Sequence, residues 1–155
     1  MRPNVHRGRT RQRGVAAVEM GIVLIPLVFL VFGITEFGRA FYQYNTIVKA
    51  TRDAARFLSG QGPGDATSIG KARCLVVYGN TDCTGSALVP GLSTGEVVVC
   101  DSTNCASTHA AQSTGSGVIN LVTVTVSGYG FTSVVPFVVP NLTFNDISTT
   151  MRQVL

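Results

Sequence analysis

Glu19 is the first residue of this chain whose type and position suggest chemistry. It lies five residues after Gly14 in the apolar run 15–34, and no other charged side chain occurs between Arg13 and Glu36. A carboxylate costs about 2.5–3.5 kcal/mol at the middle of a bilayer, and less toward its surface. An ordinary membrane anchor gains nothing from this acid, so we expect Glu19 to have a function. The alternative is a carboxylate that simply reaches the membrane surface from the start of a helix.

Four cysteines form the second chemically interesting set: Cys74, Cys83, Cys100 and Cys105. In an oxidising compartment this even number predicts two disulfides. Three pairings are possible, and the short spacings favour Cys74 with Cys83 and Cys100 with Cys105. A zinc site formed by Cys100, Cys105 and His109 is conceivable, but the spacing matches no structural zinc motif. The sequence has no C-x-x-C redox pair. We expect neither a metal nor a cofactor.

The sequence lacks the residue groupings of an enzyme active site. Its two histidines are His6, in the basic N-terminal segment, and His109, in a segment rich in Ser, Thr, Ala and Gly. Neither is expected to lie beside a nucleophile and an acid. The sequence has no phosphate-binding loop of the G-x-x-x-x-G-K-[ST] form. We therefore expect a protein that is not an enzyme.

Positive charge is concentrated in a leader, residues 1–14. The chain has 12 Lys and Arg against 8 Asp and Glu, and five arginines lie in the leader, so the remainder has 12 − 5 = 7 basic side chains. Such a leader could be a nucleic-acid arm, a membrane-surface patch or the cytoplasmic flank of an inserted helix. The flank is favoured because the apolar run begins directly after Arg13. We expect no nucleic-acid partner, and we expect the rest of the chain to lie outside the cytoplasmic membrane.

The run 15–34 has the length of a membrane span. Its 20 residues would form a helix of about 30 Å, which matches the hydrocarbon core of a bilayer. Pro26 lies within it, and membrane helices tolerate proline. A cleaved secretory signal is the main alternative. Such signals have a shorter apolar core followed by small residues at a cleavage site, whereas this run is followed by TEFGR.

Residues 35–59 are predicted to continue the same helix as an amphipathic stalk. Apolar side chains recur every three to four residues, and neither proline nor a glycine pair interrupts the pattern before Gly60. The apolar stripe begins with Phe37 and Phe41. It packs on the chain's own C-terminal sheet or contacts neighbouring subunits, and both can hold along different turns. The sequence GQGPG at 60–64 should end the helix.

Residues 60–71 are expected to be a linker and residues 72–155 a small β-rich outer domain. Strands are predicted at 72–78, 96–100, 120–127 and 142–151, the last interrupted near Asp146, with an exposed loop at 101–117. Residues 131–140, FTSVVPFVVP, either connect two strands with Phe137 in the core or form an exposed apolar patch near the membrane or another subunit. The predicted fold class is α+β: a long N-terminal helix packed on a small antiparallel sheet.

These features together resemble a known family. Arg13-Gly14 followed by Val15-Ala16-Ala17-Val18-Glu19 is similar to the class III signal of type IV pilins and pseudopilins. With the stalk sequence TRDAAR and the closing VTVTVSGYGFTSVVPFVVPNLTF, the chain resembles the TadE-like minor pilins of the tight-adherence (Flp) pilus. The resemblance is weakest between residues 60 and 117. Major Flp pilins have a tyrosine after the glutamate, and Met20 at this position fits a minor component better.

The resemblance implies a pilin-like fold and a role in assembling or priming an adhesive pilus. A prepilin peptidase would cut after Gly14, leaving Val15 as the N-terminus of 155 − 14 = 141 residues. Glu19 would then pair with the new α-amine of an adjacent subunit. The implied partners are this peptidase, other pilin and minor pilin subunits, the assembly platform in the inner membrane, and the lipid bilayer. The alternative is a membrane-anchored envelope binding domain, adhesin-like, with an uncleaved anchor.

Overall fold

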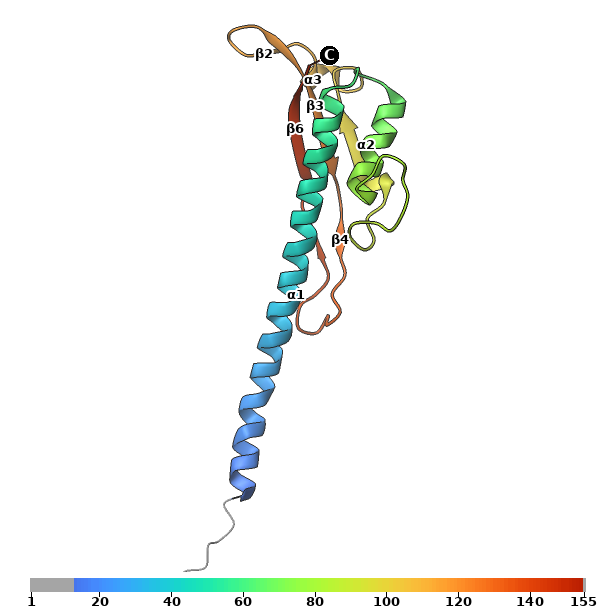
Figure 1. The fold of residues 1–155 in the computed structure, drawn as a ribbon. Helices are drawn as coiled ribbons and strands as arrows, with labels where there is room; N and C mark the ends of the chain where they lie inside the picture. The colour runs from blue at the N-terminus through green and yellow to red at the C-terminus, as the bar shows by residue number, and fades with distance from the viewer. Residues whose placement is uncertain (1–12, 155) are drawn as a thin grey trace, which may run out of the picture.

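The structure is a computed structural model that describes residues 13–154. Most of the predicted basic leader, with His6, therefore lies outside the described residues. One long helix carries a small domain along its C-terminal half (Figure 1). This helix, α1 (Arg13–Ser59), has 47 residues with Pro26 inside it, which corresponds to a length of about 70 Å. The predicted continuous helix is thus confirmed, and it ends where the glycine-rich segment begins.

The two halves of α1 have different surroundings. Residues 14–34 are exposed, apart from the half-buried Gly33. By length and composition, α1 could cross a membrane. In the second half, buried positions recur every three to four residues, at Glu36, Ala40, Gln43, Ile47, Ala50, Thr51, Ala54, Ala55 and Leu58. The stripe therefore packs on the chain's own domain from Ile47 onward, whereas Phe37 and Phe41 are exposed.

An antiparallel sheet covers one side of the second half of α1. Its central strand β3 (Val118–Val126) pairs with β1 (Val97–Cys100), with β2 (Gln112–Ser113) and with β6 (Ile147–Gln153). Side chains in β3 alternate as predicted. Val122, Val124 and Val126 are buried, while Thr123 and Thr125 are only half-buried. The valines pack with the buried face of α1 in one hydrophobic core. The predicted strands at 96–100 and 120–127 are confirmed.

The predicted strand at 72–78 is wrong, because these residues belong to helix α2 (Ala66–Tyr78). The Asp65 side chain accepts hydrogen bonds from the N–H groups of Thr67 and Ser68, which caps the start of the helix. Gly79 ends it with φ +73°, a conformation that favours glycine. These caps, and burial at Ser68, Ala72, Val76 and Val77, outweigh the strand preference of the valines. The expected linker at 60–71 accordingly ends inside a helix.

Two other predicted segments differ from the structure. The segment 101–117, expected to be one exposed loop, contains the short helix α3 (Ala106–His109) and strand β2, and its first residue is buried. The strand predicted at 142–151 is divided into β5 (Leu142–Thr143) and β6. These two strands belong to different sheets, since β5 pairs with β4 (Gly130–Phe131). The predicted interruption near Asp146 is therefore a change of sheet.

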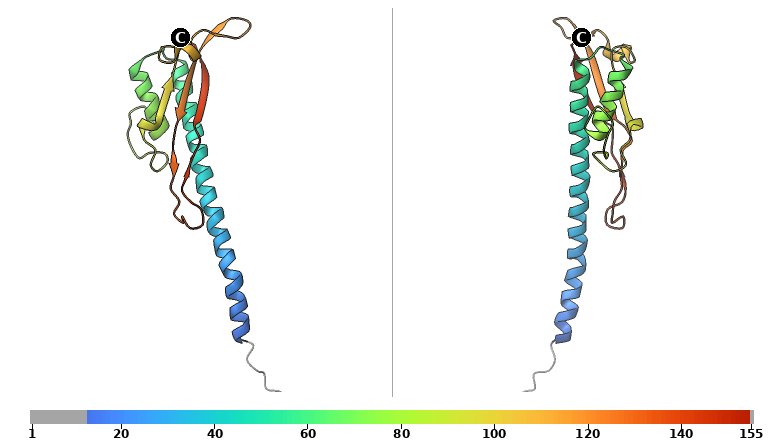
Figure 2. Two further views of the ribbon diagram at one scale, coloured as in Figure 1. Left: turned by 180° about the vertical axis from the view of Figure 1, so that it is seen from behind. Right: turned by 45° about the vertical axis from the view of Figure 1, so that its right-hand side comes forward.

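Two hairpins extend from opposite ends of the outer domain. The β2–β3 hairpin protrudes at the end furthest from the first half of α1, while the β4–β5 hairpin descends along α1 toward that half (Figure 1). Two further views show the same arrangement (Figure 2). A 3₁₀ helix, η1 (Thr94–Glu96), leads into β1.

Candidate functional site at the helix N-terminus and the stalk

Gly14 and Val15 lie in the first turn of α1. Nothing approaches within 4 Å of the position that a Cβ on Gly14 would occupy, and Val15 is exposed. The first four N–H groups of a helix have no partner within the helix, so this turn is its least stabilised part. Both residues are therefore exposed, and no described residue outside α1 approaches the Cβ position of Gly14.

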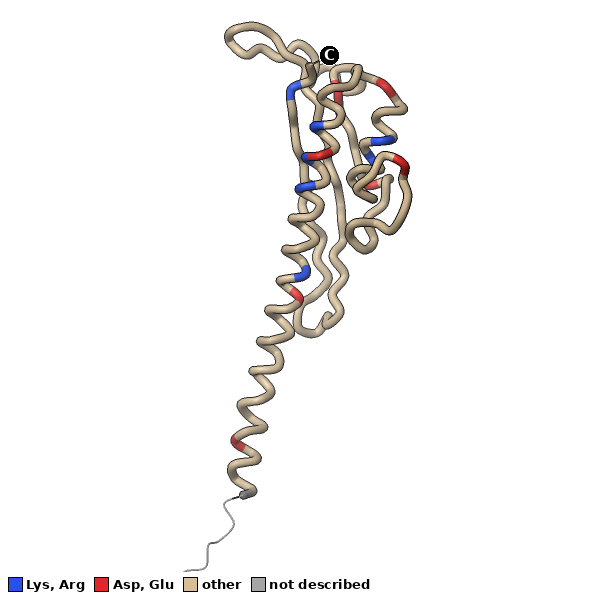
Figure 3. The backbone as a smooth tube through the Cα atoms, viewed as in Figure 1, with Lys and Arg blue, Asp and Glu red and all other residues tan. Residues whose placement is uncertain are grey.

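Glu19 lies on the same face as Val15, because residues four apart lie one above the other on a helix. Its side chain is exposed, and it forms no hydrogen bond or ion pair with residues 14–154. The tube in Figure 3 shows a single red band on the first half of α1 and no further charge until Glu36. The structure thus leaves this carboxylate free and surrounded by exposed apolar side chains.

Glu36 is a buried acid whose role the sequence did not reveal. Charged residues of an amphipathic helix usually face solvent, but Glu36 is only 3% exposed. Arg39 donates to its Oε1 at 2.7 Å, and the hydroxyl of Ser133 and the N–H of Val134 donate to its Oε2 at 2.9 and 3.0 Å. The spacing of Glu36 and Arg39 could have indicated an ion pair. No sequence signal indicated the two partners almost a hundred residues away.

The pKa of Glu36 is held below its ordinary value. Burial opposes ionisation, but the hydrogen bonds from Arg39, Ser133 and Val134, together with the Arg39 charge, outweigh this effect. Arg39 also stacks over the ring of Phe131, with 5.4 Å from its guanidinium carbon to the ring centroid. The ionised carboxylate therefore joins the β4–β5 hairpin to α1 just beyond the apolar run.

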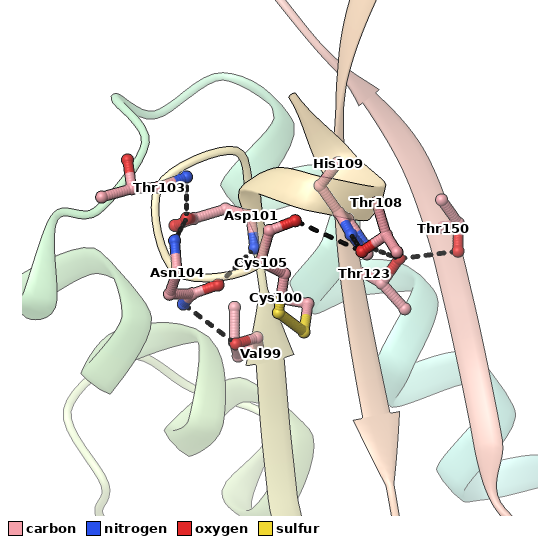
Figure 4. The surroundings of a disulfide bond; sticks show 10 residues. All are labelled: Val99, Cys100, Asp101, Thr103, Asn104, Cys105, Thr108, His109, Thr123 and Thr150. Atoms are coloured by element: carbon pink, nitrogen blue, oxygen red, sulfur yellow. Dashed lines mark hydrogen bonds between the residues drawn. A yellow bond between two sulfur atoms is a disulfide. The ribbon is translucent and has the colours of Figure 1, made fainter. Parts of the chain in front are cut away.

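A second buried acid, Asp101, stabilises the segment that follows β1 (Figure 4). One oxygen accepts hydrogen bonds from the N–H groups of Thr103 and Asn104, and the other accepts from Gly64 at 2.8 Å. Gly64 has φ +75°, and a Cβ there would lie 3.0 Å from Thr103. Burial opposes the ionised form, but these three hydrogen bonds lower the pKa of Asp101. The acid thus ties this segment to the turn between α1 and α2.

The four cysteines form two disulfides, Cys74–Cys83 and Cys100–Cys105, which is the pairing that the spacing favours. Their Cα atoms are 4.8 and 5.4 Å apart. His109 lies near the second disulfide, but its ring nitrogens contact the hydroxyls of Thr108 and Thr123 (Figure 4). The sulfur atoms of Cys100 and Cys105, two of the three ligands of the conceivable zinc site, are therefore joined in a disulfide.

Fold and site together define a pilin-like α+β protein. Its single long helix is bare and apolar in the first half and covered by an antiparallel sheet in the second. These are the features of a protein anchored in a membrane by its N-terminal helix.

Residues 14–56 match the model of a protein family described as TadE-like protein. The resemblance inferred from the sequence is confirmed over this segment, and the chain is TadE-like in its whole apolar run and most of its stalk. The matched segment begins at Gly14 and ends three residues before α1 does. Comparison with curated proteins gave no match, and neither did comparison with solved structures.

Proposed function

We propose that this chain is a minor pilin or pseudopilin that a prepilin peptidase cuts after Gly14. It acts without catalysis, in the assembly or priming of an adhesive pilus of the Tad/Flp type. The observation that carries the proposal is the TadE-like match from Gly14, over a helix whose apolar half holds one unpartnered acid. In this arrangement the leader stays in the cytoplasm, the apolar half spans the cytoplasmic membrane, and the sheet lies outside.

An ion pair with a second subunit would stabilise the carboxylate of Glu19 in the membrane. After the cut, Val15 carries a free α-amine, and an ammonium and a carboxylate that are each costly alone in lipid stabilise one another when paired. Glu19 is exposed, and the exposed side chains around it are apolar. A neighbouring helix that supplies the α-amine can therefore approach without displacing any other residue.

The exposed aromatic residues of the stalk support contacts with other pilin subunits. Phe37, Phe41 and Tyr42 are 52%, 66% and 71% exposed on α1, beyond the apolar run. Large exposed apolar side chains in one region indicate a surface that binds a partner. The proposed partners are other pilin subunits along this stripe and the assembly platform at the membrane.

The first experiment determines the N-terminal residue of the membrane protein made in a host with the pilus peptidase. The expected mature chain begins at Val15. A side chain at position 14 would obstruct a narrow protease cleft, so Gly14→Val should accumulate at full length. Gly21→Val is the matched control, because Gly21 lies in the same helix with equally open space around it, and it should be processed normally. A full-length wild-type chain in the competent host contradicts the proposal and favours an uncleaved anchor.

The second experiment tests Glu19. Glu19→Ala should be cut as efficiently as the wild type, because the bond after Gly14 is unchanged, but cells carrying it should lack pili. Electron microscopy and shear fractions of the cell surface measure this outcome. Normal pili from the variant would remove the assembly role of the carboxylate, while leaving the processing result intact.

A further inference from the structure

The β4–β5 hairpin carries an apolar tip that no part of its own domain covers. Phe137 and Val134 are 75% and 72% exposed. The sequence allowed two positions for this segment, and the structure rejects the one with Phe137 in the core. Only Phe131, Ser133 and Val139 of residues 131–140 are buried. Leaving such side chains in water is unfavourable, so the tip requires an apolar environment.

The tip lies beside the apolar half of α1. The ring of Phe137 meets that of Phe29 edge-on, with centroids 6.1 Å apart. A Cβ on Gly33 would lie 3.9 Å from Val138, an ordinary contact distance, so the tip packs close to the helix at this level. Phe29 is five residues before Ile34, where the apolar run ends, which is about 7 Å along the helix axis. The Phe137 ring is therefore level with the membrane-spanning residues and not with the stalk.

The backbone of the tip has few unpaired N–H groups. Val134 donates to Glu36, Ser133 to Asn141, Val135 to the Ser133 hydroxyl, and Val138 and Val139 both donate to the Val135 carbonyl. Pro136 and Pro140 have no N–H group. Among residues 133–140, only Phe137 has an N–H without a partner in the described part of the chain. Burying unpaired N–H groups in hydrocarbon is costly, and this tip largely avoids that cost. Among the carbonyls of residues 133–140, only that of Val135 accepts a hydrogen bond in the described part of the chain, so the pairing concerns the donors.

The hairpin itself carries no charged side chain. Residues 130–145 contain no Asp, Glu, Lys, Arg or His, and Figure 3 shows the hairpin without blue or red bands. Glu36 and Arg39 mark the level at which charge begins, and both are paired there. The hairpin thus reaches below the level of the charged residues on the same side as the apolar run.

From these observations we infer that residues 134–138 insert into the outer leaflet of the bilayer, as a second membrane contact beside α1. The occupant of this surface is lipid acyl chain. Glu36 fixes the depth of the contact, because it binds the base of the tip to the helix. The inference rests on the proposed membrane anchoring by α1, and it adds that the outer domain itself touches lipid.

The absence of tryptophan from the chain provides a direct test. Single-tryptophan variants of the full chain are reconstituted in vesicles of phosphatidylglycerol and phosphatidylcholine, with and without bromine atoms midway along the phosphatidylcholine acyl chains. Phe137→Trp reports on the tip, Phe29→Trp on the span, and Phe41→Trp on the exposed stalk. Val134→Trp is a second reporter at the base of the tip. All four positions are exposed, so the substitutions leave the core unchanged.

The expected loss of emission to bromine is similar for Phe137→Trp and Phe29→Trp, smaller for Val134→Trp, and negligible for Phe41→Trp. If Phe29→Trp is quenched but Phe137→Trp is not, α1 spans the membrane as proposed but residues 134–138 do not contact lipid. A blue-shifted but unquenched Phe137→Trp means that another copy of the chain covers the tip, which also overturns the inference. If Phe29→Trp is unquenched, the anchoring itself fails and the inference fails with it.

Discussion

Replacing Asp101 by Asn should destabilise the outer domain by about 2 kcal/mol at neutral pH. The carboxylate is 3% exposed and accepts three backbone hydrogen bonds. Hydrogen bonds to a charged group contribute about 1.5–3 kcal/mol each. Two effects reduce the sum: the amide oxygen still accepts from part of the same set, and Gly64 and Thr103 are exposed, so water can reach their N–H groups.

The pH dependence of this difference follows from the lowered pKa of Asp101. A carboxyl whose pKa is lower in the folded state stabilises the fold fully above its unfolded pKa, which is near 3.9. That stabilisation is lost as the pH falls through the folded value, since a protonated carboxyl resembles an amide. The difference in stability between wild type and Asp101→Asn should therefore be constant above about pH 5. It should shrink as the pH falls through the lowered pKa of Asp101. Asp65 and Glu36 also have lowered pKa values, but both proteins contain them, so their effects cancel.

Urea unfolding of the full chain in detergent, followed by far-ultraviolet circular dichroism at several pH values, measures both quantities. Asp146→Asn is the matched control, because Asp146 is exposed and accepts one hydrogen bond, from the Ser127 hydroxyl. This control should change stability by less than about 0.5 kcal/mol. An Asp101→Asn protein as stable as the wild type at pH 7 would refute the structural role of the carboxylate. A gap that persists unchanged at pH 2.5 would refute its ionised state.

Three further tests address the core, a disulfide and a helix cap by the same unfolding measurement. Ile47→Ala, at a site 1% exposed, should cost about 2–5 kcal/mol, whereas Phe41→Ala on the exposed stripe should cost less than about 0.5 kcal/mol. If the two variants are destabilised equally, the assignment of the packed face of α1 is wrong. Replacing both Cys74 and Cys83 by Ser opens a disulfide with a sequence separation of 9 and should cost about 2.6 kcal/mol by loop entropy. An unchanged free energy of unfolding would contradict a formed disulfide. Gly79→Ala should cost at least about 1 kcal/mol, because φ is +73° and the new Cβ would lie 3.3 Å from Leu88; a neutral result would argue against the left-handed cap.

Local periodicity sufficed to predict α1 and β3. An apolar run of membrane length followed by a stripe at helical spacing predicts a continuous helix, and strict alternation of Val and Thr predicts a half-buried strand. The same rules failed for residues 72–78, where strand-forming valines occupy a helix. The capping residues Asp65 and Gly79 were visible in the sequence and predict the helix better than side-chain preference does.

The long-range part of the site could not be predicted from the sequence. Glu36 looked like one of many polar stalk residues, and its burial depends on Ser133 and Val134 arriving from the β4–β5 hairpin. Asp101 likewise depends on Gly64, across 37 residues of sequence. Such contacts arise from tertiary packing, which a single sequence does not encode at any fixed spacing. The roles of Gly14 and Glu19 could be predicted from the sequence because they depend only on the leader and the apolar run, and they stay predictions.

The β2–β3 hairpin offers a place to attach a label. Its tip is closed by hydrogen bonds from Thr114 to the Gly117 carbonyl, its residues 113–118 are exposed, and it protrudes away from the apolar half of α1 (Figure 1). Exposed loop tips tolerate insertions because little backbone structure is disturbed. An epitope inserted after Gly115 would stand clear of both the lipid-facing and the stalk surfaces. Antibody binding to intact cells would then show where this protein resides without altering any surface that the proposed assembly uses.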